Sequence, residues 1–272
     1  MTLRDALLRG RRRPRNLGAG SPTIYRGDGY EFVELRAYVA GDDVRRIDWA
    51  ATARSGELQT RVVLEDVALT LAAIVDRSRS MRVGRRRPLL DAAEEALHAW
   101  FGAARADDRC VRVGTRGITP PPLQRSAHAA TLAPVDDELD AFDPEIVLQT
   151  ARAALARGTA LLAVSDWYEL TERHESLLGE LGARFDCTAL ITRDPWFDRL
   201  PLRGMVRLRG AEGGYVRAFV GERERAAYAH AVRAREDTLR ERFARAGWRA
   251  GVLHERDGGA SLAAAFGIGR RE

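Results

Sequence analysis

The chain has 272 residues, a formal net charge of +5 and an isoelectric point of about 9.7. This length can bury a full core, and it fits one domain with an extra segment or two small domains. The basic balance would permit nucleic-acid binding, but the arginine-rich runs at 9–15 and 82–87 lack the interleaved aromatic residues of such surfaces. We therefore expect no nucleic-acid partner, and binding through these arginines is kept only as an alternative function.

Neither a membrane span nor a signal peptide is predicted. No apolar run reaches the roughly 18 residues needed to cross a bilayer, and the stretch from Met1 to Asp5 has no apolar character of the signal-peptide type. Cys110 and Cys187 lie in apolar runs without a nearby second cysteine, so we expect buried thiols. These features predict a soluble cytoplasmic protein.

The chain divides into three predicted parts. Residues 1–28 are polar, basic and glycine-rich without a sustained apolar period, which predicts a flexible basic N-terminal arm. Residues 29–66 hold two short strand-like runs around a dense charged segment, and we expect this part to pack on a central sheet. Residues 67–272 alternate strand-like and helical runs, which predicts an α/β domain.

The charged segment of the second part gathers acids and arginines within a few residues. Its members are Gly41, Asp42, Asp43, Arg45, Arg46, Asp48 and Trp49. A local ion-pair network with Trp49 as its apolar anchor would fix the entry of the chain into the sheet. An exposed face for a partner protein is the alternative. We expect Asp48 to belong to the network and Arg45 to be exposed.

An apolar strand at 68–75 ends in a cluster of oxygen-bearing side chains. The strand has one hydroxyl and no charge, as expected of a strand covered on both faces in a parallel sheet. Asp76, Ser78 and Ser80 follow it, at the sheet edge where α/β proteins bind ligands. Turn formation and helix capping would also explain these three residues.

A second acid is predicted at the same edge. The apolar run 159–164 also has the pattern of a buried strand, and Asp166 closely follows it. Parallel strands lying close together would bring this carboxylate near that of Asp76. Carboxylate and hydroxyl oxygens are hard donors that suit Mg²⁺ or Mn²⁺. The sequence therefore predicts a candidate metal site of Asp76, Ser78, Ser80 and Asp166.

The remaining elements continue the alternation of strands and helices. Strands are predicted at 109–114, 185–192 and 248–254, a loop at 117–122, and a β-hairpin insertion at 205–220. Helices are predicted after Pro88, Asp143 and Thr171, at 222–246, and at 261–266 with Ser261 as the cap. This order favours right-handed crossovers and a mainly parallel central sheet flanked by helices.

The metal-site pattern resembles that of a known family. Asp-x-Ser-x-Ser after one strand and a lone Asp after a later one resemble the metal-ion-dependent adhesion site of von Willebrand factor A domains. That site usually adds a threonine from an intervening loop. Here the matching stretch, 134–143, contains Asp136, Asp137, Asp140 and Asp143 but no threonine, and Thr131 is the nearest hydroxyl. The resemblance thus implies a degenerate adhesion site.

A second resemblance covers most of the chain. The run from Phe32 to Arg54, FVELRAYVAGDDVRRIDWAATAR, resembles the signature of the bacterial family called domain of unknown function 58, often written DUF58. The match continues through the Asp-x-Ser-x-Ser motif and spans roughly residues 25 to 255. It implies a von Willebrand factor A-like, or Rossmann-like, fold for the third part of the chain.

The resemblance implies a non-catalytic protein-interaction module. Members of this family are thought to work beside MoxR-type AAA+ ATPases and other von Willebrand factor A-like proteins in the assembly or maturation of further proteins. A Mg²⁺-dependent phosphotransferase or hydrolase is the alternative. A phosphotransferase with an aspartate nucleophile needs a second acid where this chain has Ser78, and no glycine-rich phosphate loop follows a strand. We therefore expect no enzymatic activity.

Overall fold

The computed structural model describes residues 2–12, 31–40, 42, 44–64, 68–120, 126–132, 142–198, 200–210 and 214–269. The chain forms two compact units. Residues 14–68 make up the first, here called the signature unit, and residues 1–13 and 69–272 make up the second, the α/β unit. Among the described residues, the signature unit has one two-stranded sheet, and the α/β unit has a six-stranded sheet and a separate two-stranded one.

The signature unit is a two-stranded sheet with a short helix. Strands β1 (Glu31–Ala37) and β2 (Gln59–Leu64) pair antiparallel, and α2 (Trp49–Ser55) lies between them in the chain. The side chain of Asp48 caps α2 by accepting the amide of Ala51, and Gly56 ends the helix with a φ of 73°. The predicted packing of this part on the central sheet stays a prediction.

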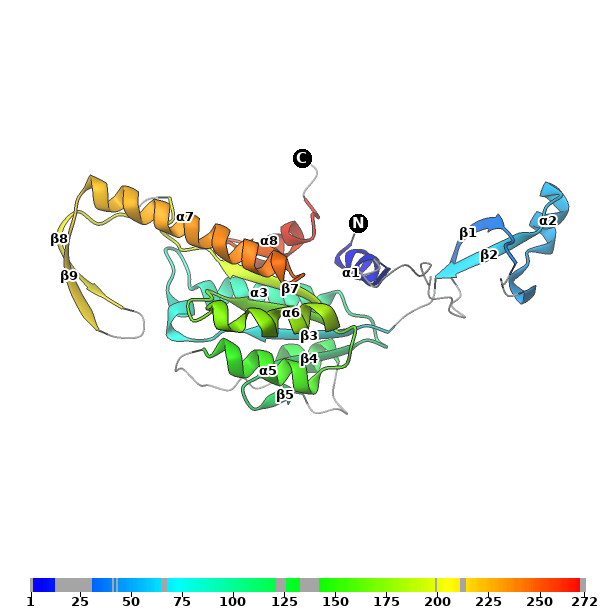
Figure 1. The fold of residues 1–272 in the computed structure, drawn as a ribbon, viewed down its shortest axis with the longest axis horizontal. Helices are drawn as coiled ribbons and strands as arrows, with labels where there is room; N and C mark the ends of the chain where they lie inside the picture. Colours follow the sequence, from blue (N-terminus) through cyan, green and yellow to red (C-terminus); the bar gives the residue numbers. More distant parts are fainter. Residues whose placement is uncertain are drawn as a thin grey trace. The chain divides into compact units, whose positions relative to one another are not determined.

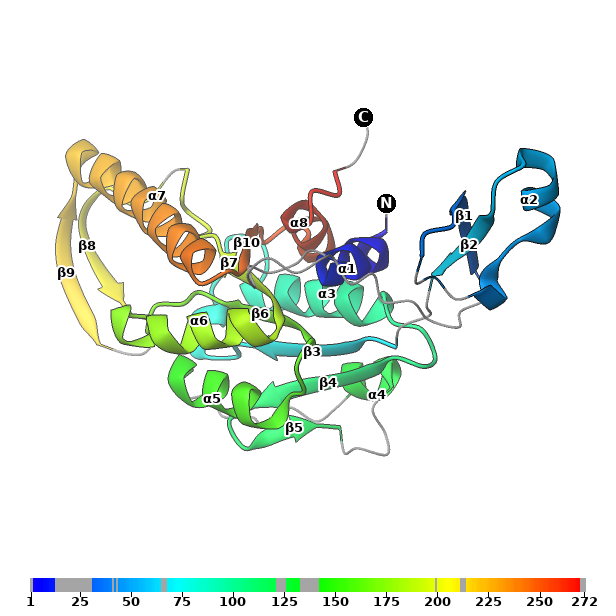
Figure 2. The same cartoon turned by 45° about the vertical axis from the view of Figure 1, so that its right-hand side comes forward.

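A six-stranded sheet forms the centre of the α/β unit, in the order β10-β7-β6-β3-β4-β5 (Figures 1 and 2). All neighbours pair in parallel except β5, which runs antiparallel to β4. The strands are β3 (Thr70–Val75), β4 (Arg109–Gly114), β5 (Gly117–Thr119), β6 (Ala160–Ser165), β7 (Asp186–Thr192) and β10 (Arg249–Leu253). The prediction of a mainly parallel sheet flanked by helices is confirmed. The predicted loop at 117–122 is wrong for its first three residues, which form strand β5.

Alternate residues of the central strands face two hydrophobic layers. In β3, Leu71 enters one layer and Ala72 the other. Cys110 is buried in the layer of Leu71 and Cys187 in the layer of Ala72, and burial raises the pKa of Cys110 to about 12. The layer of Leu71 is covered by α1 (Leu3–Arg12), α3 (Leu89–Gly102), α4 (Ala127–Leu132) and α8 (Gly258–Ala265). The layer of Ala72 is covered by α5 (Pro144–Ala154), α6 (Glu175–Arg184) and α7 (Glu222–Arg245).

Helix α1 corrects the predicted N-terminal arm. Leu7 of this helix is buried in the layer beneath α3, and Arg4 forms a buried ion pair with Asp108. The helix therefore belongs to the α/β unit, and the prediction of a flexible arm is wrong for the residues of α1. The rest of the predicted arm, 13–28, lies outside the described residues.

Two further elements complete the α/β unit. Strands β8 (Gly204–Arg209) and β9 (Tyr215–Val220) form the predicted β-hairpin, which both views place beyond the sheet at the start of α7 (Figures 1 and 2). Helix α8 is capped by Asp257, which accepts the amide of Ala260, and the predicted cap at Ser261 is wrong. Within the described ranges, none of the helices combines the length and apolar character that crossing a bilayer requires.

Candidate cation site at the carboxyl edge of the sheet

The two acids predicted for the metal site follow neighbouring strands. Strands β3 and β6 are adjacent and parallel, with Val75 opposite Val164, and the amide of Asp76 continues the pairing by donating to the Val164 carbonyl at 2.9 Å. Asp166 comes directly after the last residue of β6. Both acids therefore lie at the carboxyl edge of the sheet, where the sequence placed them.

Asp76 is a buried carboxylate held from two sides. It is 1% exposed, and it accepts the Ser78 amide at 2.8 Å and the Ser165 hydroxyl at 2.6 Å. Burial raises the pKa of Asp76, the hydrogen bonds from Ser165 and Ser78 oppose that change, and the charge of Asp166 raises the pKa further. The two carboxylates are thus like charges that follow adjacent parallel strands at one edge of the sheet.

The two serines of the motif lie next to each other. The hydroxyl oxygens of Ser78 and Ser80 are 3.0 Å apart and share one hydrogen bond, for which either can be the donor. A short 3-10 helix, Arg79–Arg82, carries the chain away from the strand. The motif therefore presents one carboxylate and two hydroxyls from a single tight segment.

Trp167 turns the chain sharply after Asp166. Its φ is 58°, in the left-handed region that a bulky L-residue rarely adopts. The indole is buried, donates to the Leu190 carbonyl at 3.2 Å and meets the ring of Phe243 edge-on at 5.0 Å. Packing of the indole therefore holds a backbone conformation that the isolated chain would avoid.

Tyr168 is the exposed neighbour of the candidate site. Its amide donates to the Asp166 carboxylate at 2.9 Å, and its side chain is 61% exposed. Arg235 of α7 stacks on its ring at 3.7 Å and donates to the Asp166 carbonyl at 2.8 Å. Helix α7 thus supports the loop that carries the second acid.

The donor set fits a hard cation in its chemistry. Asp76, Asp166 and the hydroxyls of Ser78 and Ser80 supply oxygen atoms only, which is the preference of Mg²⁺ and Mn²⁺. A cation would also offset the repulsion between the two carboxylates. The hydroxyls are essential to the candidate, because no group of three or more His, Cys, Asp or Glu suited to a metal occurs within the described residues.

A third contributor of the adhesion-site type is not found among the described residues. The hydroxyl of Thr131 donates to the Ala127 carbonyl within α4, and the carboxylate of Asp143 caps α5. Both side chains are therefore engaged in helices. Asp136, Asp137 and Asp140 lie outside the described residues.

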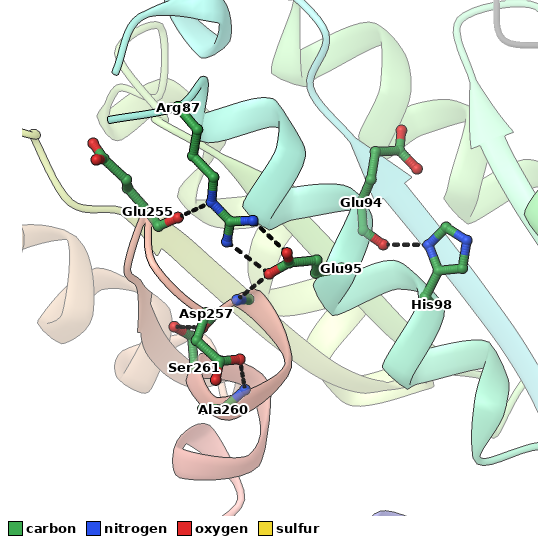
Figure 3. Close-up of polar contacts among 9 residues, drawn as sticks. Arg87, Glu94, Glu95, His98, Glu255, Asp257, Ala260 and Ser261 are labelled. Carbon is green, nitrogen blue, oxygen red and sulfur yellow. Dashed lines mark hydrogen bonds and ion pairs between the residues drawn. The ribbon is translucent and has the colours of Figure 1, made fainter. Parts of the chain in front are cut away.

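The loop after the motif, 83–88, is held by acidic side chains from other elements. The carboxylate of Glu255 accepts the amides of the two residues before Arg87, at 2.7 and 2.8 Å. Arg87 donates to the Glu255 carbonyl and pairs with Glu95 of α3, which also accepts the Gly258 amide at 3.0 Å (Figure 3). The loop 83–88 is therefore hydrogen-bonded to α3 and to the segment just before α8.

Replacing Glu95 with glutamine should destabilise the α/β unit in a pH-dependent way. The hydrogen bond from Arg87 lowers the pKa of Glu95 to about 2, from an ordinary value of 4.5. The contribution of the ionised carboxylate is therefore complete above 4.5 and is lost as the pH falls toward 2. Because the side chain is 44% exposed, we expect about 1 kcal/mol or less at neutral pH. Urea unfolding of both proteins between neutral and acidic pH measures the difference, and a pH-independent difference would contradict this role.

Two acids of the charged segment in the signature unit form ion pairs with arginines of the neighbouring strands. Asp42 is buried and pairs with Arg36 at 2.8 Å, and Asp48 pairs with Arg61 at 2.9 Å. The amide of Ala51 and then Arg61 hold the pKa of Asp48 below its usual value. The cations of these two pairs thus come from β1 and β2.

The anchor predicted for this network is wrong. Trp49 is the first residue of α2 and is 68% exposed. Arg45 is exposed, as predicted. Gly41 and Asp43 lie outside the described residues, as does the side chain of Arg46.

Sequence reasoning missed two contributors to the site. Ser165 ends β6 and donates to Asp76, and its position immediately before Asp166 was a usable signal. Arg235 lies 69 residues from its partner Asp166, and one arginine among many in α7 offers no such signal.

Solved structures match part of the chain at low identity. The conserved hypothetical protein BatB from Bacteroides thetaiotaomicron matches with a TM-score of 0.40 and 10% identity, over 66% of this chain and 98% of that one. An aerotolerance-related membrane protein from Bacteroides fragilis, solved with multiple mutations to serines, matches with a TM-score of 0.42 and 12% identity, over 73% of this chain and 96% of that one.

Sequence relatives give the family. Uncharacterized proteins of Mycobacterium bovis and Mycobacterium tuberculosis are 28% identical over 204 residues, which cover 71% of this chain. The matched region spans 64% of the length of these relatives. The family described as protein of unknown function DUF58 matches residues 34–238. This match covers most of the chain, which therefore belongs to the DUF58 family.

Proposed function

We propose that this protein is a non-catalytic interaction module that works with a MoxR-type AAA+ ATPase, and with other von Willebrand factor A-like proteins, in the assembly or maturation of further proteins. Its α/β unit would be of the von Willebrand factor A type, with a degenerate adhesion site. The observation that carries the proposal is the pair of acids at the ends of β3 and β6, with Asp76 buried and bonded to Ser165.

Four residues would hold the cation: Asp76, Ser78, Ser80 and Asp166. A bound Mg²⁺ or Mn²⁺ would offer a coordination position to a carboxylate of the partner protein. The chain itself prepares this position, since the Ser78 amide and the Ser165 hydroxyl orient the carboxylate of Asp76. The exposed ring of Tyr168, backed by Arg235, lies beside it and is available to the same partner.

The signature unit would supply a second contact with the ATPase. Its acids Asp42 and Asp48 are engaged in local ion pairs, whereas Val39, Val44 and Trp49 are exposed. These exposed apolar side chains would be the contacts that the signature unit offers to the ATPase. Because the ATPase consumes ATP, the proposal places this partnership in the cytoplasm.

Magnesium should stabilise the wild-type protein but not the Asp76→Asn variant. At a concentration ten times its Kd, a cation that binds only the folded state stabilises it by about 1.4 kcal/mol. We expect this gain as a rise in the thermal midpoint of wild type and of Asp91→Asn, which alters an exposed acid on α3. Equal rises in wild type and Asp76→Asn would place the cation elsewhere and overturn the site.

The partnership has its own test. Purified MoxR-type ATPase from the same genome should be retained by the immobilised protein in the presence of Mg²⁺. Retention should fall for Asp76→Asn if the cation receives the ATPase, and for Trp49→Ala if the signature unit does. Retention that is unchanged in both variants, or no retention of the ATPase by wild type, would contradict the proposed partnership.

A further inference from the structure

The β8–β9 hairpin carries an unusual combination of side chains on one face. Residues directly opposite each other in an antiparallel pair share a face, and Met205 pairs with Phe219, Arg207 with Arg217, and Arg209 with Tyr215. The hairpin projects beyond the central sheet in both views (Figures 1 and 2). We call this set of six residues the arginine face: Met205, Arg207, Arg209, Tyr215, Arg217 and Phe219.

The positive charge of the arginine face is not neutralised within the described part of the chain. Its three arginines are exposed, none of them forms an ion pair with a described residue, and the strands β8 and β9 contain no acid. Arg207 and Arg217 lie directly opposite each other. Like charges in this position destabilise a strand pair. A negatively charged partner would remove that repulsion.

The arrangement of Tyr215 favours carboxylates over nucleic-acid bases. The guanidinium of Arg207 lies over the tyrosine ring at 4.1 Å, and that of Arg209 is 5.9 Å from the same ring. Arg207 thus already stacks on the tyrosine ring, which reduces the aromatic surface left for stacking on a base. A guanidinium stacked in this way keeps its N–H edge free, and that edge matches the two oxygens of a carboxylate.

The other end of the arginine face is apolar. Met205 is 73% exposed and Phe219 is 63% exposed, and they lie opposite each other near the start of α7. Each strand of the hairpin pairs only with the other among the described residues, so both outer edges keep unpaired backbone groups. An isolated two-stranded hairpin is marginal in water and gains stability from a further strand or a covering surface.

We infer that the arginine face binds an extended, acidic segment of a partner protein. Residues two apart in a strand lie about 6.7 Å from each other on one face. Carboxylates at alternate positions of an extended segment therefore match the spacing of Arg207 and Arg209. Apolar side chains of the segment would cover Met205 and Phe219, and its backbone can pair with an open edge of the hairpin.

This surface is distinct from the candidate cation site. None of its six residues belongs to the set of Asp76, Ser78, Ser80 and Asp166, and binding through guanidinium groups requires no metal. Binding in the presence of EDTA therefore tests the arginine face without testing the proposed function, and either proposal can fail alone.

The test uses a fluorescent peptide of about seven residues, the length of a strand, in which alternate positions carry one valine followed by glutamates and the positions between them carry threonine. Fluorescence anisotropy in EDTA should give saturable binding to the full chain, and a peptide with glutamine in place of glutamate should not bind. Changing Arg207, Arg209 and Arg217 together to glutamine should weaken binding at least about tenfold, because each exposed ion pair contributes only a small part.

A matched variant controls for net charge. Arg157, Arg233 and Arg256 are exposed arginines outside the hairpin, and their joint replacement with glutamine removes the same charge. This variant should bind the peptide within about twofold of wild type, since distant surface charges are screened. Circular dichroism shows whether each variant is folded.

Three outcomes would overturn the inference. The first is equal loss of binding in both triple variants, and the second is no binding of the acidic peptide to wild type. The third is binding of oligothymidylate or phosphatidylglycerol vesicles, dependent on the three hairpin arginines, without binding of the peptide. That result would assign the face to nucleic acid or to a lipid surface.

Discussion

Replacing Asp108 with alanine is expected to lower the free energy of unfolding of the α/β unit by about 3–5 kcal/mol. The carboxylate is buried and accepts the amides of Leu69 at 2.6 Å and Arg105 at 2.7 Å, together with the guanidinium of Arg4. Truncation would leave two amides and a largely buried cation without their acceptor. Denaturant unfolding measures the loss.

The neighbouring acid provides the control for this prediction. Asp107 is exposed, so Asp107→Ala should change the free energy of unfolding by no more than about 0.5 kcal/mol. A loss below about 1 kcal/mol in Asp108→Ala would show that water replaces the carboxylate. In that case the link between α1 and the start of β3 would contribute little to stability.

A methyl group added at Gly258 should be nearly as damaging, with an expected loss of about 3 kcal/mol. The Cβ of an alanine there would lie 1.8 Å from the carbonyl oxygen of Ala92 and 2.9 Å from the amide nitrogen of Ala96. Both are backbone atoms of α3, so no side-chain rotation relieves the overlap. Helix α8 would have to move away from α3, which disturbs the layer that contains Leu262.

Gly259, the next residue in α8, provides the control for this prediction. A Cβ at Gly259 would meet its nearest neighbours at 3.6 and 3.9 Å, which is ordinary contact. Gly259→Ala should therefore be neutral or stabilise α8 by up to about 1 kcal/mol. Similar unfolding midpoints for the two variants would mean that α8 and α3 do not approach as closely as described.

The central sheet was predictable because its strands are buried on both faces. A strand such as β3 needs apolar side chains at every position to enter both layers, and this produces a continuous apolar run in the sequence. The acids of the candidate site were predictable for the same reason, since each follows such a run. The short strand β5 has no pattern of its own and exists because its residues pair with β4.

Helix α1 and Trp49 show where pattern reading fails. The arginines around Leu3 and Leu7 mask an apolar spacing of four residues, which is the spacing of one helix face. Trp49 was expected inside because of its apolar ring, but its place at the start of α2 leaves it exposed. Burial of a single aromatic residue depends on packing between distant segments, which local sequence does not encode.

The left-handed backbone conformation of Trp167 couples the candidate site to the packing of the protein interior. A change of the Trp167 backbone to an ordinary negative φ requires the indole to leave the ring of Phe243 and to lose its hydrogen bond to the Leu190 carbonyl. The segment from Asp166 to Tyr168 can therefore relax only when that hydrophobic layer opens as well. The amide protons of this surface loop would then exchange with solvent as slowly as those of the core, because both exchange in the same cooperative opening. The loop that carries Asp166 would therefore open only as often as the interior does.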